Sequence, residues 1–176
     1  MSNFDQTLVL LKNKEKPLDF LVHFHQVLVK NQLFLKTDYV VYNDTRLGEE
    51  KEPDEVETHL ESDEIFLLNA IHSWPGLGLL LYTHPDFKYE IGFNFLSWDD
   101  VQLYGFEVSF HGHEFGEIAA FQKHRNFFEQ LKTWIDYRYI IGDIGNASKN
   151  YISMNKDFDE ICQFIDSHHF EIDFRN

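Results

Sequence analysis

The residues best suited to chemistry lie near the middle of the chain, where His111 and His113 flank a single glycine. On a β-strand, residues two apart point to the same face, so both imidazoles could reach one metal ion. Glu107 has the same strand parity as His111 and could add a carboxylate ligand. Zinc or manganese held in this way would activate water for hydrolysis. The pattern therefore raises a metal-dependent hydrolase centred on His111 and His113 as one hypothesis.

The small number of ligands weakens the metal hypothesis, and His25, His168 and His169 are expected to have structural roles. Two histidines are fewer ligands than a catalytic zinc site uses, and no second motif of fixed spacing supplies the rest. Gly112 could also end the strand between them. His25 lies on the apolar face of a predicted helix, where a hydrogen-bonded core histidine is expected. His168 and His169 fit the C-terminus of a helix, where positive charge is favoured.

No other segment carries a recognisable catalytic motif. The single cysteine, Cys162, has the apolar neighbours Ile161 and Ile165, which predict a small buried residue rather than a nucleophile. The chain has no Gly-x-Ser-x-Gly sequence, and its glycines at 76–78 and 142–145 lack the lysine of a phosphate loop. We therefore expect a protein that is not an enzyme and that uses no cofactor.

The strongest functional signal is an acidic stretch at 44–64. It holds ten acidic residues against two basic ones, a net charge of −8 out of −15 for the whole chain. Gly48 and Pro53 interrupt regular structure, so we expect an exposed acidic loop at about 44–62. Its acids do not repeat at the spacing of a calcium loop. Such a surface suits the lysine and arginine side chains of another protein.

The residues expected to contact a partner form two groups. The acids expected to meet its basic side chains are Asp54, Glu55, Glu57, Glu61, Asp63 and Glu64. A second contact is expected at Trp98 with Asp99 and Asp100, where an aromatic ring beside two acids lies in a predicted turn. Aromatic residues often anchor protein interfaces, and exposure of Trp98 beside two acids is at least as well supported by the sequence as core packing, so Trp98 is the expected anchor of this second contact.

The elements that must position these groups are organised around the segment 77–113. Three apolar and aromatic runs joined by two short turns predict an antiparallel meander of three strands. In its last strand, Glu107, Ser109 and His111 share the face opposite to the aromatic one. We expect helices to cover the aromatic face and the Glu107 face to be the exposed side of a scaffold.

Helices and strands alternate irregularly on both sides of the meander. Helical spacing of apolar residues predicts helices at about 17–31, 63–73, 117–135 and 157–168. Ser62 is the expected N-cap of the second helix, Ile65 lies on its expected buried stripe, and Asp157 opens the last helix through a capping box. Further strands are expected at 39–42, 137–141 and 170–174, and at 7–11 a strand or helical arm that the polar run 12–16 ends. The sequence predicts an α+β fold with a mostly antiparallel sheet, a central three-strand meander and about four helices.

The length and composition indicate a single domain spanning 1–176. A chain of 176 residues buries enough surface to fold without disulfides or a structural metal. The start of the chain has no basic segment followed by an apolar run, and no apolar run approaches the ~18 residues that cross a bilayer. We therefore expect a cytoplasmic protein. Its excess of acids disfavours direct binding to nucleic acid or anionic membranes.

Charge and the lack of a catalytic motif favour a binding function. We expect an acidic inhibitor, of the type of an immunity protein, that neutralises a basic toxin such as a nuclease by blocking its active cleft. A nucleic-acid mimic that blocks a DNA-binding enzyme is a related possibility. The alternatives are the metal-dependent hydrolase at His111 and His113 and an uncommitted cytoplasmic regulatory domain.

Overall fold

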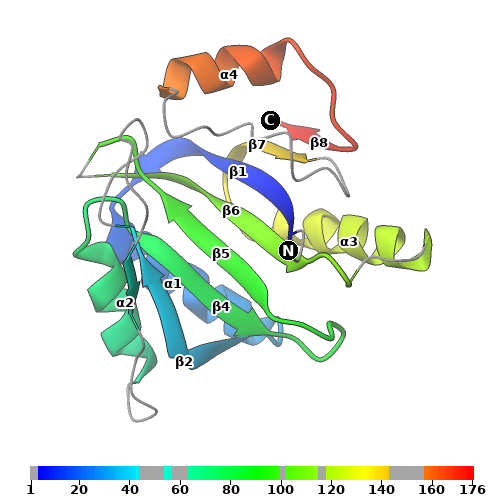
Figure 1. The fold of residues 1–176 in the computed structure, drawn as a ribbon. Coiled ribbons are helices and arrows are strands. Elements are labelled where there is room, and N and C mark those ends of the chain that lie inside the picture. Colours follow the sequence, from blue (N-terminus) through cyan, green and yellow to red (C-terminus); the bar gives the residue numbers. More distant parts are fainter. Residues whose placement is uncertain (1–3, 44–53, 57–62, 100–101, 115–117, 143–156) are drawn as a thin grey trace.

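The structure of the chain is a computed structural model that describes residues 4–43, 54–56, 63–99, 102–114, 118–142 and 157–176 (Figure 1). Within these ranges the strands are β1 (Phe4–Glu15), β2 (Phe34–Tyr42), β3 (Asp54–Val56), β4 (Gly78–Thr83), β5 (Ile91–Leu96), β6 (Leu103–His111), β7 (Tyr137–Gly142) and β8 (Ile172–Arg175). The helices are α1 (Pro17–Lys30), α2 (Glu64–His72), α3 (Ile118–Leu131) and α4 (Phe158–Asp166). The predicted α+β class is confirmed.

All the described strands join in one antiparallel sheet in the order β3-β2-β4-β5-β6-β1-β7-β8. The predicted meander is confirmed, because β4, β5 and β6 are consecutive neighbours. The N-terminal strand lies between β6 and β7, deep in the sheet. The prediction that the polar run 12–16 ends this strand is wrong. Glu15 still pairs with Leu103, beyond an irregularity in the register. The helix begins only at Pro17.

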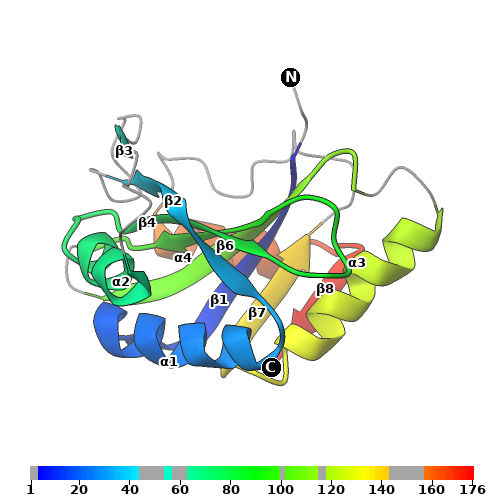
Figure 2. The same cartoon turned by 90° about the horizontal axis from the view of Figure 1, so that it is seen from below.

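One face of the sheet is covered by α1, α2 and α3, and carries the main core (Figure 2). Phe24 of α1 is the centre of an aromatic cluster, with ring centroids 5.7 Å from Phe93 and 5.0 Å from Phe106. Both partners belong to the aromatic face predicted for the meander. His25 is only 8% exposed, and its ring nitrogens lie 2.9 Å from the Tyr82 hydroxyl and 2.9 Å from the Glu64 carboxylate. The predicted core histidine is therefore confirmed.

The structure corrects two details of α2. Its N-cap is Asp63 rather than Ser62, because the Asp63 carboxylate accepts a hydrogen bond of 2.7 Å from the Phe66 amide. Ile65 is 68% exposed and Phe66 is 56% exposed, so Ile65 does not belong to the buried stripe. The helix is rotated so that Leu67, Leu68 and Ile71 face the core instead.

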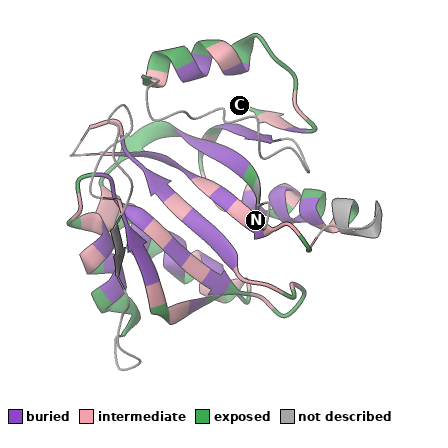
Figure 3. Ribbon diagram, in the orientation of Figure 1, coloured by how far each residue is buried: buried purple, intermediate pink, exposed green. Residues whose placement is uncertain are grey.

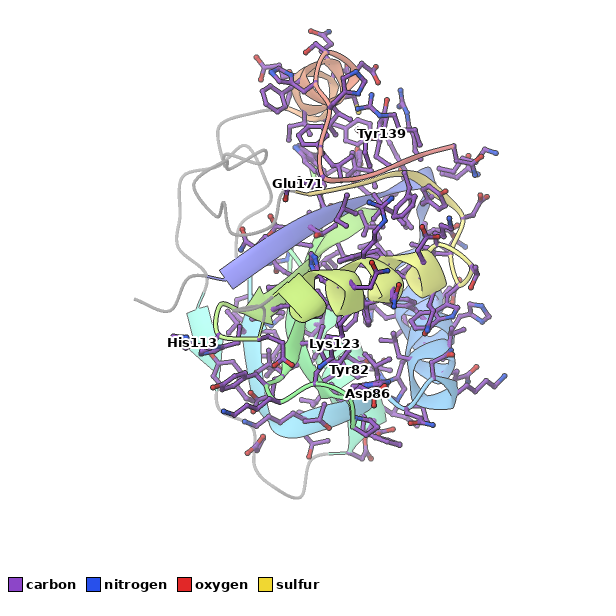
Figure 4. All side chains as sticks on the ribbon, turned by 90° about the vertical axis from the view of Figure 1, so that its right-hand side faces the viewer. Tyr82, Asp86, His113, Lys123, Tyr139 and Glu171 are labelled. Atoms are coloured by element: carbon purple, nitrogen blue, oxygen red, sulfur yellow. The ribbon has the colours of Figure 1, made fainter. Side chains whose placement is uncertain are left out.

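The opposite face of the sheet is only partly covered by a described helix, since α4 lies over its β1–β7–β8 end (Figure 1). The capping box predicted at Asp157 is present, and Ile161, Cys162 and Ile165 point inward. They contact a second apolar cluster that includes Leu10 and Tyr139. Tyr139 lies beneath the helix, and its hydroxyl donates a hydrogen bond of 2.6 Å to Asp166 (Figure 4). Burial raises the pKa of the Cys162 thiol, consistent with the predicted small buried residue.

The prediction of an acidic loop over the whole of 44–62 is wrong for part of this stretch. Its residues Asp54–Val56 form β3, which pairs with Val40, Val41 and Tyr42 and is one edge of the sheet. The flanking residues 44–53 and 57–62 lie outside the described part of the chain. None of the described helices is long and apolar enough to cross a membrane.

Candidate functional site

The face of the sheet that α4 only partly covers contains a cavity of about 430 Å³. It lies over β2, β4, β5 and β6, and burial alternates along β4 and along the second half of β6, where every second side chain faces the cavity (Figure 3). A volume of this size is within the range of ligand pockets. Its lining residues are Gln6, Tyr39, Val41, Asn43, Leu79, Leu81, Glu90, Gly92, Asn94, Glu107, Ser109 and His111.

Cross-strand pairing explains why these residues meet. In an antiparallel sheet, paired residues point to the same face. Asn94 pairs with Glu107 on one side and with Leu79 on the other, and Leu79 pairs in turn with Val41. The same transverse row ends at the sheet edge, where Glu55 is the register partner of Val41. The acidic stretch therefore enters the sheet directly beside the cavity.

Glu107 is the residue that gives the cavity its chemistry. Its Oε2 accepts a hydrogen bond of 3.3 Å from Asn94 Nδ2, and Asn94 Oδ1 accepts one of 2.9 Å from Asn43. Glu107 is half-buried and faces the cavity, and burial of its carboxyl group raises its pKa, although the Asn94 hydrogen bond acts in the opposite direction. Among the described residues no cation pairs with this carboxylate.

The polar groups beside Glu107 have spare hydrogen-bonding capacity. Within the described ranges, Glu107 Oε1 and the side chains of Ser109 and Gln6 make no hydrogen bond to other protein groups. Gly92 keeps this part of the cavity open, since a Cβ atom there would lie 2.3 Å from the Ser109 hydroxyl oxygen. Three polar side chains therefore face one space whose remaining walls include Leu79 and Leu81.

The second carboxylate of the cavity, Glu90, already has a cationic partner. Lys36 Nζ lies 3.1 Å from Glu90 Oε1. A backbone hydrogen bond and the Lys36 ammonium together lower the pKa of Glu90. The His111 ring stacks on Tyr89 at 4.1 Å between centroids, at the far end of the cavity from Asn94. Glu107 is therefore the acid of the cavity that lacks a cation in the described structure.

The proposed metal ligands share a region of the sheet but do not form a ligand set. His111 and His113 lie 5.2 Å apart between ring centroids, and the His111 Nδ1 atom accepts the backbone amide of His113. Glu107 is four residues from His111 along an extended strand, about 13 Å away at ~3.3 Å per residue. Across the described ranges, no three His, Cys, Asp or Glu side chains gather as a metal site would require.

Glu114, next to these histidines, has a structural role. Its carboxylate accepts the backbone amides of Lys88 and Tyr89 at 3.0 Å each and lies 3.1 Å from Lys123 Nζ. The burial of this carboxyl opposes these contacts, and the net effect is a lowered pKa. Glu114 therefore fastens the turn between β4 and β5 to the segment after β6. His113, in the same segment after β6, is exposed.

The acids expected to contact a partner are divided between several elements. Asp54 and Glu55 lie in β3 at the sheet edge, whereas Glu57, Glu61 and Asp100 fall outside the described residues. Asp63 caps α2, and Glu64 contacts His25 while remaining about half exposed. Ile65 and Phe66 follow these two acids and are exposed. The sequence pattern did not identify this apolar pair, because helical spacing placed Ile65 in the core.

Trp98 and Asp99 are involved in intramolecular contacts. The Trp98 ring is half-buried and lies 5.3 Å from both Tyr104 and Phe158 between centroids, so it packs beside the start of α4. Asp99 accepts hydrogen bonds of 2.7 Å from the Tyr104 hydroxyl and 2.7 Å from the Gln102 amide. Both residues thus stabilise the β5–β6 connection and leave less freedom for an interface than their sequence context indicates.

The prediction that Glu107, Ser109 and His111 share a face is confirmed, but their surroundings are not those of a plain exposed scaffold. Sequence reasoning missed the contribution of Asn94 and Asn43. The available signal was strand parity, which places Asn94 on the non-aromatic face of its strand, opposite Glu107 in a meander. Searches of protein-family models, of curated proteins and of solved structures found no match to this chain.

Proposed function

We propose that this protein is an acidic inhibitor that binds a basic protein partner, such as a toxin nuclease, and blocks its active cleft. The observation that carries the proposal is the sheet face with the cavity, near the edge strand β3, where Glu107 has no cationic partner among the described residues. Complementary charge across an interface raises association rates and selects the partner. A nuclease cleft, which binds phosphates, supplies that complementary charge.

Apolar anchors are also exposed on α2, which packs on the face of the sheet opposite to the cavity but contacts β2, the neighbour of the edge strand β3. Ile65 and Phe66 are exposed at the start of α2, directly after Asp63 and Glu64. Aromatic anchors surrounded by polar groups contribute most of the free energy in many interfaces. Phe66 therefore replaces the half-buried Trp98 as the aromatic residue that we assign to the contact.

The direct test uses the product of the gene adjacent to this one, since an inhibitor and its toxin are commonly encoded together. That product is purified and assayed for nuclease activity with increasing amounts of the inhibitor. We expect activity to fall to zero at one molecule of inhibitor per molecule of enzyme. A product that keeps its activity with excess inhibitor, or that has no toxic activity, would overturn the proposal.

Charge-neutralising variants separate specific contact from general acidity. Asp54→Asn combined with Glu55→Gln should slow association, because two charges at the β3 edge are removed. The control is Asp19→Asn with Asp136→Asn, two exposed acids outside β3 and the cavity lining that change the net charge equally. Stopped-flow association rates should fall for the β3 pair and remain close to wild type for the control. Equal rates for both pairs would exclude the β3 edge as the contact.

A further inference from the structure

The cavity over β2, β4, β5 and β6 has the properties of a selective site rather than of a general acidic surface. It is large enough for one side chain or a small molecule, and among the described residues Glu107 is its one carboxylate without a cationic partner. Within the described part of the chain, its acceptors without a hydrogen-bond donor are Glu107 Oε1, the Ser109 hydroxyl and the Gln6 amide oxygen. The apolar side chains Leu79 and Leu81 line the same cavity, next to Gly92.

These features distinguish between the cations that proteins present. An ammonium group is compact and strongly hydrated, so removing its water in a partly apolar cavity is costly. A guanidinium group is more weakly hydrated, planar and rich in donors, and it matches a carboxylate with adjacent hydroxyl and amide acceptors. A divalent ion would need more oxygen ligands than Glu107 and its neighbours supply. Guanidinium is therefore the cation that this set of groups fits best.

We propose that the cavity is a guanidinium site that receives one arginine side chain of the basic partner, which rests on the proposed function. The guanidinium donates hydrogen bonds to Glu107 and to the Ser109 hydroxyl, and the methylene stem lies along Leu79 and Leu81. Lys36 neutralises Glu90, so the cavity accepts one cationic group. Asn94 and Asn43 position the Glu107 carboxylate, because they form a chain of hydrogen bonds that ends on it.

The site can be tested without the partner, using N-acetyl-argininamide as the probe. Titration into the isotope-labelled protein should give saturable chemical-shift changes at the backbone amides of Gly92 and Ser109. A single side chain should bind with a dissociation constant of about a millimolar. N-acetyl-citrullinamide, which has the same shape without the charge, should not bind, and N-acetyl-lysinamide should bind more weakly than the arginine probe.

Two variants test the assignment of Glu107. Glu107→Gln keeps an oxygen acceptor for Asn94 but removes the charge, so affinity for the probe should fall by about tenfold or more. Ser109→Leu should also abolish binding, because it fills the cavity from the adjacent position on the same strand face. Asp19→Asn is the control, and its affinity should equal that of the wild type. Unchanged affinity in Glu107→Gln, or no saturable binding of the arginine probe, would overturn the proposal.

The same variants distinguish this site from the proposed function. If the toxin is inhibited but Glu107→Gln binds it as tightly as the wild type, the assignment of the cavity to a partner arginine is wrong, although the inhibitor function stands. If the arginine probe binds and no toxin is inhibited, the inhibitor function falls, and the cavity is a site for a free guanidinium compound. Loss of both probe and toxin binding in Glu107→Gln supports the two proposals together.

Discussion

The two halves of a single sheet face have opposite characters. Over β1 and β7 the face is apolar, and the inward residues of α4 close it with side chains such as Ile161 and Ile165. Over β4, β5 and β6 no described helix covers it, and Glu107, Asn94 and Ser109 line a cavity there. Both halves are antiparallel, so the side chains that the strands present to this face account for much of the difference.

The change from apolar to polar side chains occurs between two paired residues in one row across the sheet. Leu8 is 2% exposed in the apolar cluster, and its partner on β6 is Glu107. The next residue of the row after Glu107 is Asn94. A carboxyl group beside an apolar cluster loses hydration and raises the free energy of the folded state when it is ionised. Residues that reduce stability in this way are typical of functional sites.

The largest expected effect comes from truncating the same residue type in each half. Leu10→Ala removes a fully buried side chain beneath α4, so the free energy of unfolding should fall by about 2–5 kcal/mol. Leu81→Ala removes a half-buried side chain from the cavity wall and should cost about 1 kcal/mol or less. Urea unfolding followed by tryptophan fluorescence gives both values. Equal losses would mean that the cavity half is packed as tightly as the α4 half.

The next expected effect is a gain in stability rather than a loss, in the variant Glu107→Gln. Burial raises the pKa of Glu107, so as pH rises above the usual glutamate range the unfolded chain loses its proton before the folded protein does. Wild-type stability therefore decreases over this range until the folded pKa is passed. Glu107→Gln does not titrate, so it should melt at a higher temperature than the wild type at about pH 8, with little difference at about pH 4.

Because other carboxyl groups titrate equally in both proteins, the difference between the two melting curves isolates Glu107. Scanning calorimetry at the two pH values measures it. A Gln variant that is less stable than the wild type at about pH 8 would show that the folded protein stabilises the Glu107 carboxylate. The cavity half would then be structural, as the α4 half is.

The local sequence pattern could predict the elements of each half, but not that β1 pairs with β6 and so joins the two halves in one sheet. Alternation identified the meander and placed Glu107, Ser109 and His111 on one face, and the capping box identified α4. The row that joins Leu8 to Glu107 depends on long-range pairing of β1 with β6. Strand parity carries no information about such pairing, since any strand of matching pattern could occupy that position. The cavity therefore could not be derived from the sequence.

The acidic stretch and the histidine pair illustrate the same limit. Their composition identified charge and donor atoms correctly, but not which groups are already partnered. Glu64 contacts His25 across 39 positions of sequence, and Asp99 holds Tyr104. Conversely, the sequence indicated Glu107 only as one residue of a polar edge. It is a candidate cation-binding group because no cation pairs with it within the described structure. Partners of this kind are set by tertiary packing.

The smallest expected effect concerns the polar contact that accompanies the apolar closure by α4. Tyr139→Phe removes the hydrogen bond from the Tyr139 hydroxyl to Asp166 but leaves the ring in place, so stability should fall by about 1 kcal/mol. Affinity for N-acetyl-argininamide should not change, because Tyr139 does not line the cavity. A loss larger than that of Leu10→Ala would mean that polar contacts, rather than apolar burial, hold α4 on the sheet. The contrast between an apolar, closed half and a polar half that binds cations would then no longer hold, because both halves would depend on charged groups.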